Sequence, residues 1–231
     1  MSKKKIAIQG ELGAYSHIAA ENLYKDSEIK TCTTFEETFK QAYNDPSYKI
    51  VIPIENSLAG RVADIHYLLP KYKLQIHGEH FQAVEHNLLC KPDATISDIK
   101  FVRSHAQAIG QCQNLIAKKK FKPIISADTA GSAKDLAEGK DKTIAAIASE
   151  LSAKIYNLKI LEKNIEDEKG NVTRFLIMGK NIEQPEFKEE KKFITSCIFR
   201  VKSEPSALYK CLGGFATNQV NLTKLESFSV K

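Results

Sequence analysis

The chain has 231 residues, 42% of them hydrophobic, which is enough to bury a core and to form one to three domains. Its formal net charge of +6 comes from interspersed acidic and basic residues, and the lysine run at residues 118–120 is too short for a nucleic-acid-binding patch. The N-terminal residues lack an apolar signal core and no run of about 18 apolar residues occurs, so we expect a cytoplasmic protein without a membrane partner. The five cysteines are scattered without a CxxC pair, which favours reduced thiols over disulfides or a zinc site.

The first third of the chain alternates between short apolar runs and helical spacing. Residues 5–9 and 50–54 are predicted strands, and Pro53 requires the second strand to end or to bulge there. Ser16 begins a predicted helix after a turn at residues 10–13. The glycines of that turn resemble a phosphate-binding loop only weakly, because no lysine–serine pair follows.

Three polar residues follow the strand at 50–54 directly: Glu55, Asn56 and Ser57. Gly60 comes next, and apolar residues then recur at helical spacing up to Leu69, so we predict a helix there. A strand, polar tip and helix form ligand sites at the carboxyl edge of open α/β sheets. The alternative is that Asn56 or Ser57 only caps the helix.

Strand character returns at residues 74–90, which carry His77, His80 and His86 with two glutamates. A metal site is the less favoured interpretation of these histidines, because no HExxH spacing occurs on a helix. Ordinary polar strand positions are the favoured interpretation.

Ser104 and His105 follow a predicted strand at 99–103 and precede a helix through Ala108 and Ile116. Adjacent side chains diverge and no aspartate is placed to orient the imidazole, so a hydrolase triad is disfavoured.

Residues 124–126 and 143–148 are further predicted strands, each followed by a helix. A charged loop at 164–171 then delivers Thr173 and Arg174 to the head of a strand that runs to Met178. A guanidinium beside a hydroxyl suits an anionic ligand, and a surface salt bridge is the open alternative.

Residues 181–192 have no apolar period and are a predicted linker. Beyond them we expect a strand at 193–199, a helix capped by Ser203 that runs on past Gly213 and Gly214, and a strand at 220–227. Strand, helix and strand make half of a ferredoxin-like unit. Because half a sheet exposes an unpaired edge, we expect either a truncated domain or completion by a partner chain.

Read together, the polar clusters resemble prephenate dehydratases. The matching blocks are residues 10–16, the PIENS block at 53–57 with Gly60, residues 104–107 with Gln111 and Cys112, residues 128–130, and Thr173–Phe175. The tail, with residues 207–208 and 221–227, is similar to the amino-acid-sensing ACT domain of that family.

This resemblance implies an α/β fold with two Rossmann-like lobes of periplasmic-binding-protein type II character and a cleft between them. Lobe one would comprise about residues 1–77 and 173–180, lobe two about 78–172, and a partial ACT domain residues 193–231. It further implies a cytoplasmic carbon–oxygen lyase, a hydro-lyase that needs no cofactor or metal. The reaction would convert prephenate to phenylpyruvate in phenylalanine biosynthesis, with feedback by L-phenylalanine and a homodimer or homotetramer as the assembly. Arogenate as substrate, or a non-catalytic two-lobed protein that binds small anions, are the alternatives.

The resemblance also assigns residues. Thr173 is the implied catalytic residue, with Glu55 as a candidate proton donor, and we expect Arg174 to bind a substrate carboxylate. Implied substrate-binding residues are Tyr15, Ser16, Asn56, Ser57, Ser104, His105, Gln107, Thr129, Ala130, Arg174 and Phe175. Implied allosteric residues are Ala207, Leu208, Asn221, Leu222, Glu226 and Ser227.

The sequence departs from the family pattern at several positions. Ala14 removes a hydroxyl from the first block, and Ala106 replaces a common proline. Asp128 stands where a hydroxyl residue is usual, and we expect it to cap a helix. Ser206 and Phe228 alter the sensing blocks, so phenylalanine feedback is the weakest implied property.

Overall fold

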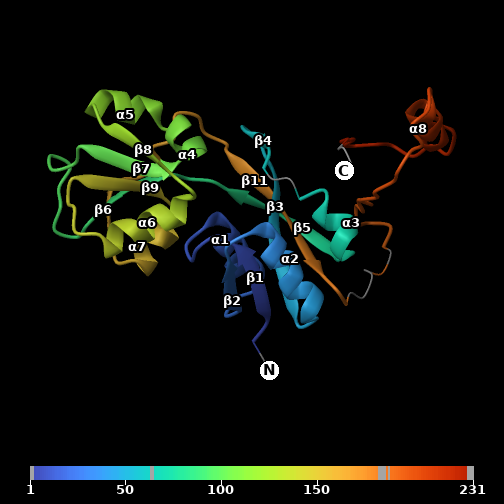
Figure 1. Ribbon diagram of the computed structural model, residues 1–231, viewed down its shortest axis with the longest axis horizontal. Coiled ribbons are helices and arrows are strands. Elements are labelled where there is room, and N and C mark those ends of the chain that lie inside the picture. Colours follow the sequence, from blue (N-terminus) through green and yellow to red (C-terminus); the bar gives the residue numbers. More distant parts are fainter. Residues whose placement is uncertain (1–2, 63–64, 182–185, 187, 228–231) are drawn as a thin grey trace. The chain divides into compact units, whose positions relative to one another are not determined.

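The computed structural model describes residues 3–62, 65–181, 186 and 188–227, and the chain divides into two units at residues 183 and 184. The larger unit contains two mixed sheets with helices packed on them, which form two lobes (Figure 1). The predicted two-lobed α/β architecture is therefore confirmed. No helix of the described residues is long and apolar enough to cross a membrane.

Lobe one is built on a sheet with the strand order β2-β1-β3-β11-β5, and β4 pairs with β3. β1 runs parallel to β2 and β3, whereas β11 runs antiparallel to β3 and β5. The strands are β1 (Lys5–Gln9), β2 (Glu28–Cys32), β3 (Tyr48–Asn56), β4 (Gly60–Arg61), β5 (Gln75–Ala83) and β11 (Val172–Gly179). The helices are α1 (Tyr15–Leu23), α2 (Phe35–Asn44) and α3 (Leu68–Tyr72).

The alternation of side chains along β3 produces two hydrophobic layers. Ile50 and Ile52 lie in a buried cluster with residues of α2 and α3. Val51 points to the other face, where it joins a cluster with residues of α1. Both faces of the central strand are covered, which explains its unbroken apolar sequence.

The β3 strand continues past Pro53 by means of a bulge. The register with β11 shifts between the pairs Phe175–Pro53 and Arg174–Glu55, which leaves Ile54 as an extra residue. The bulge that Pro53 predicted is therefore confirmed.

The helix predicted to start just after Gly60 is wrong. Residues 57–59 form a turn, Gly60 has a positive φ of 72°, and the chain reverses into β4 alongside β3. Only Leu68–Tyr72 is helical, and residues 63–64 lie outside the described residues. Asn56 stabilises this turn rather than a helix, since its Oδ1 accepts the backbone N–H groups of Leu58 and Ala59.

Lobe two has the strand order β10-β6-β9-β7-β8. Because β5 pairs with β11, the boundary between the lobes lies near residue 84 and not at residue 78 as predicted. The predicted helix through Ala108 and Ile116 is two short helices that meet at Gln111 and Cys112. The strands are β6 (Asn87–Cys90), β7 (Phe101–His105), β8 (Lys122–Ser126), β9 (Ile144–Ala148) and β10 (Lys159–Glu162). The helices are α4 (Ala106–Gly110), α5 (Gln113–Lys119), α6 (Thr129–Glu138) and α7 (Glu150–Ile155).

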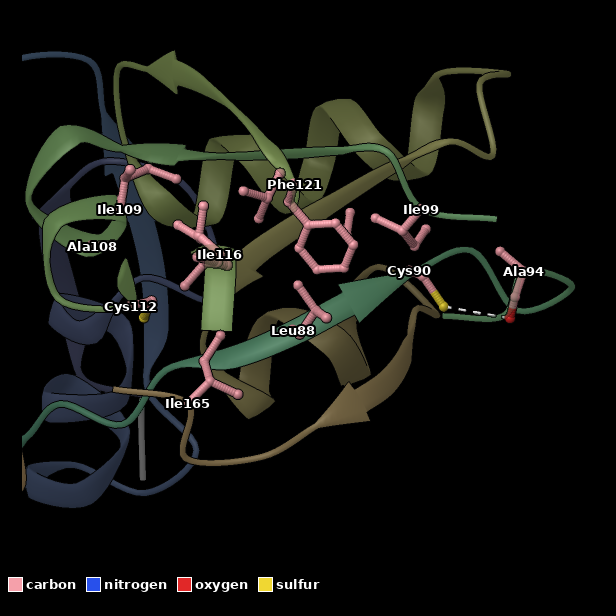
Figure 2. Close-up of a cluster of buried hydrophobic side chains, with 13 residues drawn as sticks. Leu88, Cys90, Ala94, Ile99, Ala108, Ile109, Cys112, Ile116, Phe121 and Ile165 are labelled. Atoms are coloured by element: carbon pink, nitrogen blue, oxygen red, sulfur yellow. Dashed lines mark hydrogen bonds between the residues drawn. The ribbon is translucent and has the colours of Figure 1, made fainter. Parts of the chain in front are cut away.

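One core of lobe two packs aliphatic side chains around the ring of Phe121 (Figure 2). Leu88 from β6 and Ile116 from α5 lie against this ring, so the cluster fixes α5 to the sheet. At the edge of the sheet, Asp128 Oδ1 accepts the Gly131 N–H at 2.5 Å and caps α6, as predicted.

In the smaller unit, α8 (Ala207–Thr217) is the single regular element among the described residues. The predicted helix is confirmed and continues through Gly213 and Gly214, although its N-cap residue is Ser206, which makes no side-chain cap, and not Ser203. The strands predicted at 193–199 and 220–227 are wrong for the described residues, so no βαβ unit forms there. None of the described residues of this unit is buried, and a strand without a partner or a covered face has little to hold it.

Candidate active site

The side chains of Thr173 and Asn56 meet at the ends of β11 and β3. The two residues are paired in the sheet register, and Asn56 Nδ2 donates to Thr173 Oγ1 at 3.0 Å. The orientation of the Asn56 amide is fixed, because its Oδ1 accepts the N–H groups of Leu58 at 3.1 Å and Ala59 at 2.9 Å. Thr173 Oγ1 must therefore accept, and its own proton finds no acceptor among the described residues. This buried hydroxyl can donate to a bound molecule.

The β3 bulge determines which face of the sheet carries this pair. Side chains alternate along a strand, and the extra residue Ile54 shifts that alternation by one. Asn56 consequently lies on the face of Val51 and Phe175, toward α1, and not on the face of Ile52. A regular strand that kept Ile54 without a bulge would place Glu55, and not Asn56, opposite Thr173.

Glu55 and Arg174 lie on the opposite face, one residue along each strand. Arg174 Nε and Nη2 both donate to Glu79 Oε2, at 2.7 Å and 2.6 Å, while its Nη1 lies 3.8 Å from Glu55 Oε2. The guanidinium is thus occupied by carboxylates of its own lobe, which supports the salt-bridge interpretation of Arg174. Glu55, the candidate proton donor, therefore lies on the other face of the sheet from Thr173.

A chain of hydrogen bonds extends from Asn56 into lobe two. Asn56 Nδ2 also donates to Asn171 Oδ1 at 2.6 Å, and Asn171 Nδ2 donates to Gln111 Oε1 at 3.1 Å. Gln111 Oε1 also lies 2.9 Å from His86 Nε2. Asn171 was not among the predicted site residues, although it directly precedes the strand that carries Thr173.

This chain of hydrogen bonds ends at Tyr15 of α1. Its hydroxyl donates to the Glu85 carbonyl at 2.6 Å and lies 3.1 Å from His86 Nδ1. Burial raises the pKa of Tyr15 well above 10 and lowers the pKa of His86 below 6.5, so both groups are neutral near pH 7. Tyr15 was predicted to bind substrate, but its hydroxyl instead joins α1 to the segment between β5 and β6. No three His, Cys, Asp or Glu side chains gather as a metal site in the described part of the chain.

Several predicted hydroxyl residues hold the backbone. Ser57 Oγ donates to the Gly170 carbonyl at 3.2 Å and accepts the Val172 N–H at 3.0 Å, which ties the turn after β3 to the start of β11. Ser104 is fully buried and donates to the Ile147 carbonyl at 2.7 Å. Its hydroxyl lies inside lobe two, so the hydrolase alternative has no exposed nucleophile there.

Lobe two contributes further predicted residues around α4. His105 Nδ1 accepts the Gln107 N–H at 3.3 Å and caps α4. Gln107 Nε2 lies 3.5 Å from Asn56 Oδ1, so the Gln107 amide joins the candidate site.

The remaining predicted residues are placed as follows. Ser16 is buried in α1, Thr129 is half-buried at the start of α6, and Ala130 is fully buried. Phe175 is only 1% exposed and packs in the core with Ile8 and Val51. The prediction that Phe175 lines a substrate site is therefore wrong, because its ring faces hydrophobic side chains. The predicted allosteric residues lie in α8 or in the exposed stretch after it.

A family model described as "Prephenate dehydratase" matches residues 6–183, which include nearly all of both lobes. The chain belongs to the prephenate dehydratase family. The candidate active site lies entirely within the matched residues.

Relatives within this family carry more than one description. A bifunctional N-acyl-homoserine lactone acylase/prephenate dehydratase of Komagataeibacter europaeus is 40% identical over 98% of this chain and 80% of its own. Arogenate dehydratase/prephenate dehydratase 2 of Arabidopsis thaliana is also 40% identical over 98% of this chain, which spans only 59% of the plant protein.

The fold matches a solved prephenate dehydratase as well. The Arthrobacter aurescens enzyme in complex with L-Phe superposes with a TM-score of 0.83 over 97% of this chain and 76% of its own, at 24% identity. This similarity supports the two-lobed fold.

Proposed function

We propose that this protein converts prephenate to phenylpyruvate, water and carbon dioxide. Family membership supports the reaction class, and the hydroxyl of Thr173, oriented by Asn56, supplies the donor that the chemistry needs. The bond from the ring to its carboxylate breaks, carbon dioxide leaves, and the electron pair enters the ring. The bond from the ring to the hydroxyl breaks in turn, and the product ring is aromatic.

Thr173 would hydrogen-bond the departing hydroxyl. Its Oγ1 accepts from Asn56 at 3.0 Å, so its proton is directed at the substrate and negative charge that develops on the leaving oxygen is stabilised. A proton from solvent converts the released hydroxide to water. The intrinsic drive toward aromaticity leaves the protein mainly with orientation and charge stabilisation to provide.

The expectation that Arg174 binds a substrate carboxylate needs revision. Arg174 already pairs with Glu79, and the Asp128 carboxylate accepts the N-terminal Gly131 N–H of α6. The amide of Gln107, which reaches from lobe two to 3.5 Å from Asn56, is a better-placed neutral donor. The net charge of +6 favours the approach of a dianion but selects none.

The purified full chain, assayed with prephenate and no added cofactor, tests this proposal by the appearance of phenylpyruvate. Arogenate, which carries an amino group in place of the keto oxygen, is measured in parallel. A higher kcat/KM for arogenate would reverse the substrate assignment, and turnover of neither acid by folded protein would contradict the reaction and favour a binding protein.

An N-acyl-homoserine lactone belongs in the same assay because one relative is described as cleaving such compounds. We expect no acyl release through Ser104, since that hydroxyl is fully buried and bonded to the Ile147 carbonyl.

We further propose feedback by L-phenylalanine and assembly into a homodimer or homotetramer, on the resemblance of residues 207–208 and 221–227 to a sensing domain. Sedimentation with and without phenylalanine, together with the inhibition curve, tests both. A monomer whose turnover phenylalanine leaves unchanged would contradict them.

A further inference from the structure

The hydrogen-bond chain from Asn56 to His86 lies where the two lobes are joined. One connection between the sheets runs from β5 to β6 and contains His86, and the other runs from β10 to β11 and contains Asn171. Gln111, at the junction of α4 and α5, lies between them and bonds to both. Each side chain in this chain of hydrogen bonds is a planar amide or an imidazole. Its donor and acceptor atoms can therefore be assigned from its partners.

At Asn56, the backbone fixes the donor-to-acceptor direction of these hydrogen bonds. Asn56 Oδ1 accepts two main-chain N–H groups, so its Nδ2 must face Asn171 and donate. Asn171 then presents Oδ1 to Asn56 and Nδ2 to Gln111. Gln111 must offer its carbonyl oxygen to Asn171, and the same oxygen faces His86 Nε2.

His86 satisfies this direction only when Nε2 carries a proton. In that tautomer Nε2–H donates to Gln111 Oε1, and Nδ1 is an acceptor that shares the single proton of the Tyr15 hydroxyl with the Glu85 carbonyl. In the other tautomer two acceptors, His86 Nε2 and Gln111 Oε1, would face each other at 2.9 Å. The buried imidazole is 2% exposed, so water would not relieve that repulsion easily.

We propose that His86 is a positioning residue for the dehydration: as the Nε2–H tautomer it holds the amides of Gln111 and Asn171 in the orientation that matches the Asn56 amide, and so keeps Asn56 in place beside Thr173. This inference rests on the proposed function for its effect on turnover. The charged groups around His86 are Glu85 on its own segment and Glu166 on the connection to β11, whose carboxylate accepts the His86 backbone N–H at 2.9 Å. Both neighbours are acceptors, and neither competes for Nε2–H.

The tautomer can be observed without any activity measurement. In protein with ¹⁵N-labelled histidine, a long-range ¹H–¹⁵N spectrum assigns the protonated ring nitrogen, and His86→Gln identifies the His86 signal among the six histidines. We expect the Nε2–H form. In Asn56→Asp the carboxylate accepts at both oxygens. The side-chain amides of Asn171 and Gln111 must therefore flip, and His86 must change to the Nδ1–H form. An Nδ1–H form in the unaltered protein, or an unchanged tautomer in Asn56→Asp, would overturn the proposal.

A matched pair of variants tests the effect on the reaction. His86→Gln places an N–H donor near the position of the His86 Nε2 atom. His86→Asn places its amide near the position of Nδ1 and leaves Gln111 Oε1 without this donor. We expect His86→Gln to keep kcat within a few-fold and His86→Asn to lose about tenfold or more at similar KM. Equal turnover in two variants of similar thermal stability would refute the positioning role. Absence of dehydration in the unaltered protein would refute the proposed function instead, and the tautomer would still be measured.

Discussion

Asn56 Nδ2 lies 3.0 Å from Thr173 Oγ1, across the antiparallel pair of β3 and β11. Two main-chain donors fix the amide, and the amide fixes the hydroxyl, so a turn in the backbone decides where the Thr173 proton can point.

Thr173→Val should lower kcat by roughly 10²–10³ with little change in KM, because valine has the shape of threonine without the oxygen that donates to the leaving hydroxyl. Thr173→Ser keeps that oxygen and is the matched control, for which we expect most of the activity. Steady-state kinetics of the two variants give the comparison. If the Thr173→Val variant turned over prephenate as fast as the Thr173→Ser variant, the Thr173 hydroxyl would have no part in the chemistry.

Phe175 should contribute to stability and not to substrate binding. Its ring is buried among Ile8 and Val51, so Phe175→Ala should lower the free energy of unfolding by about 3–5 kcal/mol. Phe175→Leu fills more of the space and should leave KM unchanged. Phe81→Leu, at a ring that is 59% exposed, is the control and should change little in urea unfolding. A raised KM in Phe175→Leu at unchanged stability would restore the substrate-binding role.

Gly13 should tolerate no side chain. Its φ of 90° is strained for other residues, and an added Cβ would lie 2.8 Å from Ser152 Cα in lobe two. The Gly13 carbonyl also accepts from Ser149 Oγ at 2.6 Å and Ser152 Oγ at 3.0 Å, so the contact between the lobes depends on this approach. Gly13→Ala should lower the melting temperature by several degrees, as expected for a loss of more than about 1 kcal/mol.

Gly110→Ala is the matched control for Gly13→Ala. An added Cβ at Gly110 meets open space in α4, so we expect unchanged or slightly higher stability. Equal melting temperatures for the two variants would show that Gly13 makes no close contact in solution.

The free energy of unfolding should fall as the pH drops from about 6.5 to about 4. Burial, with a smaller effect of the Lys49 charge, lowers the pKa of His77 from 6.5 to about 4. The unfolded chain therefore binds a proton in this range while the folded chain does not, so this stability is complete above pH 6.5 and is lost as the pH falls. His17 and His86, whose pKa values burial also lowers, act in the same direction.

His77→Leu should reduce that loss, because leucine cannot bind a proton in either state and also removes an Nε2 atom that is buried without a partner among the described residues. Urea unfolding at about pH 7.5 and about pH 5 measures the difference for each protein. Parallel pH dependences for the variant and the unaltered chain would contradict a half-buried, neutral His77.

Many strands and helices of the larger unit could be predicted, because β-branched runs such as Ile50–Ile52 and helix caps such as Asp128 are local signals, whereas the two lobes were implied by the family resemblance. The Thr173 and Asn56 positions followed from family resemblance, and the structure adds their contact. Asn171 and the role of His86 could not be predicted, since their partners lie 115 and 25 residues away along the chain. The strands expected in the tail failed for a related reason: alternation in the sequence creates no strand where a partner strand is lacking.

The bulge at Ile54 lets β3 carry one residue more than the facing part of β11 while Glu55 and Asn56 keep their pairs. Deletion of Ile54 would leave a regular ladder that still pairs Glu55 with Arg174 and Asn56 with Thr173. A regular strand that kept Ile54 would instead pair Glu55 with Thr173 and bring a carboxylate to that hydroxyl in place of the amide. Within this scaffold, the bulge therefore decides which side chain meets Thr173.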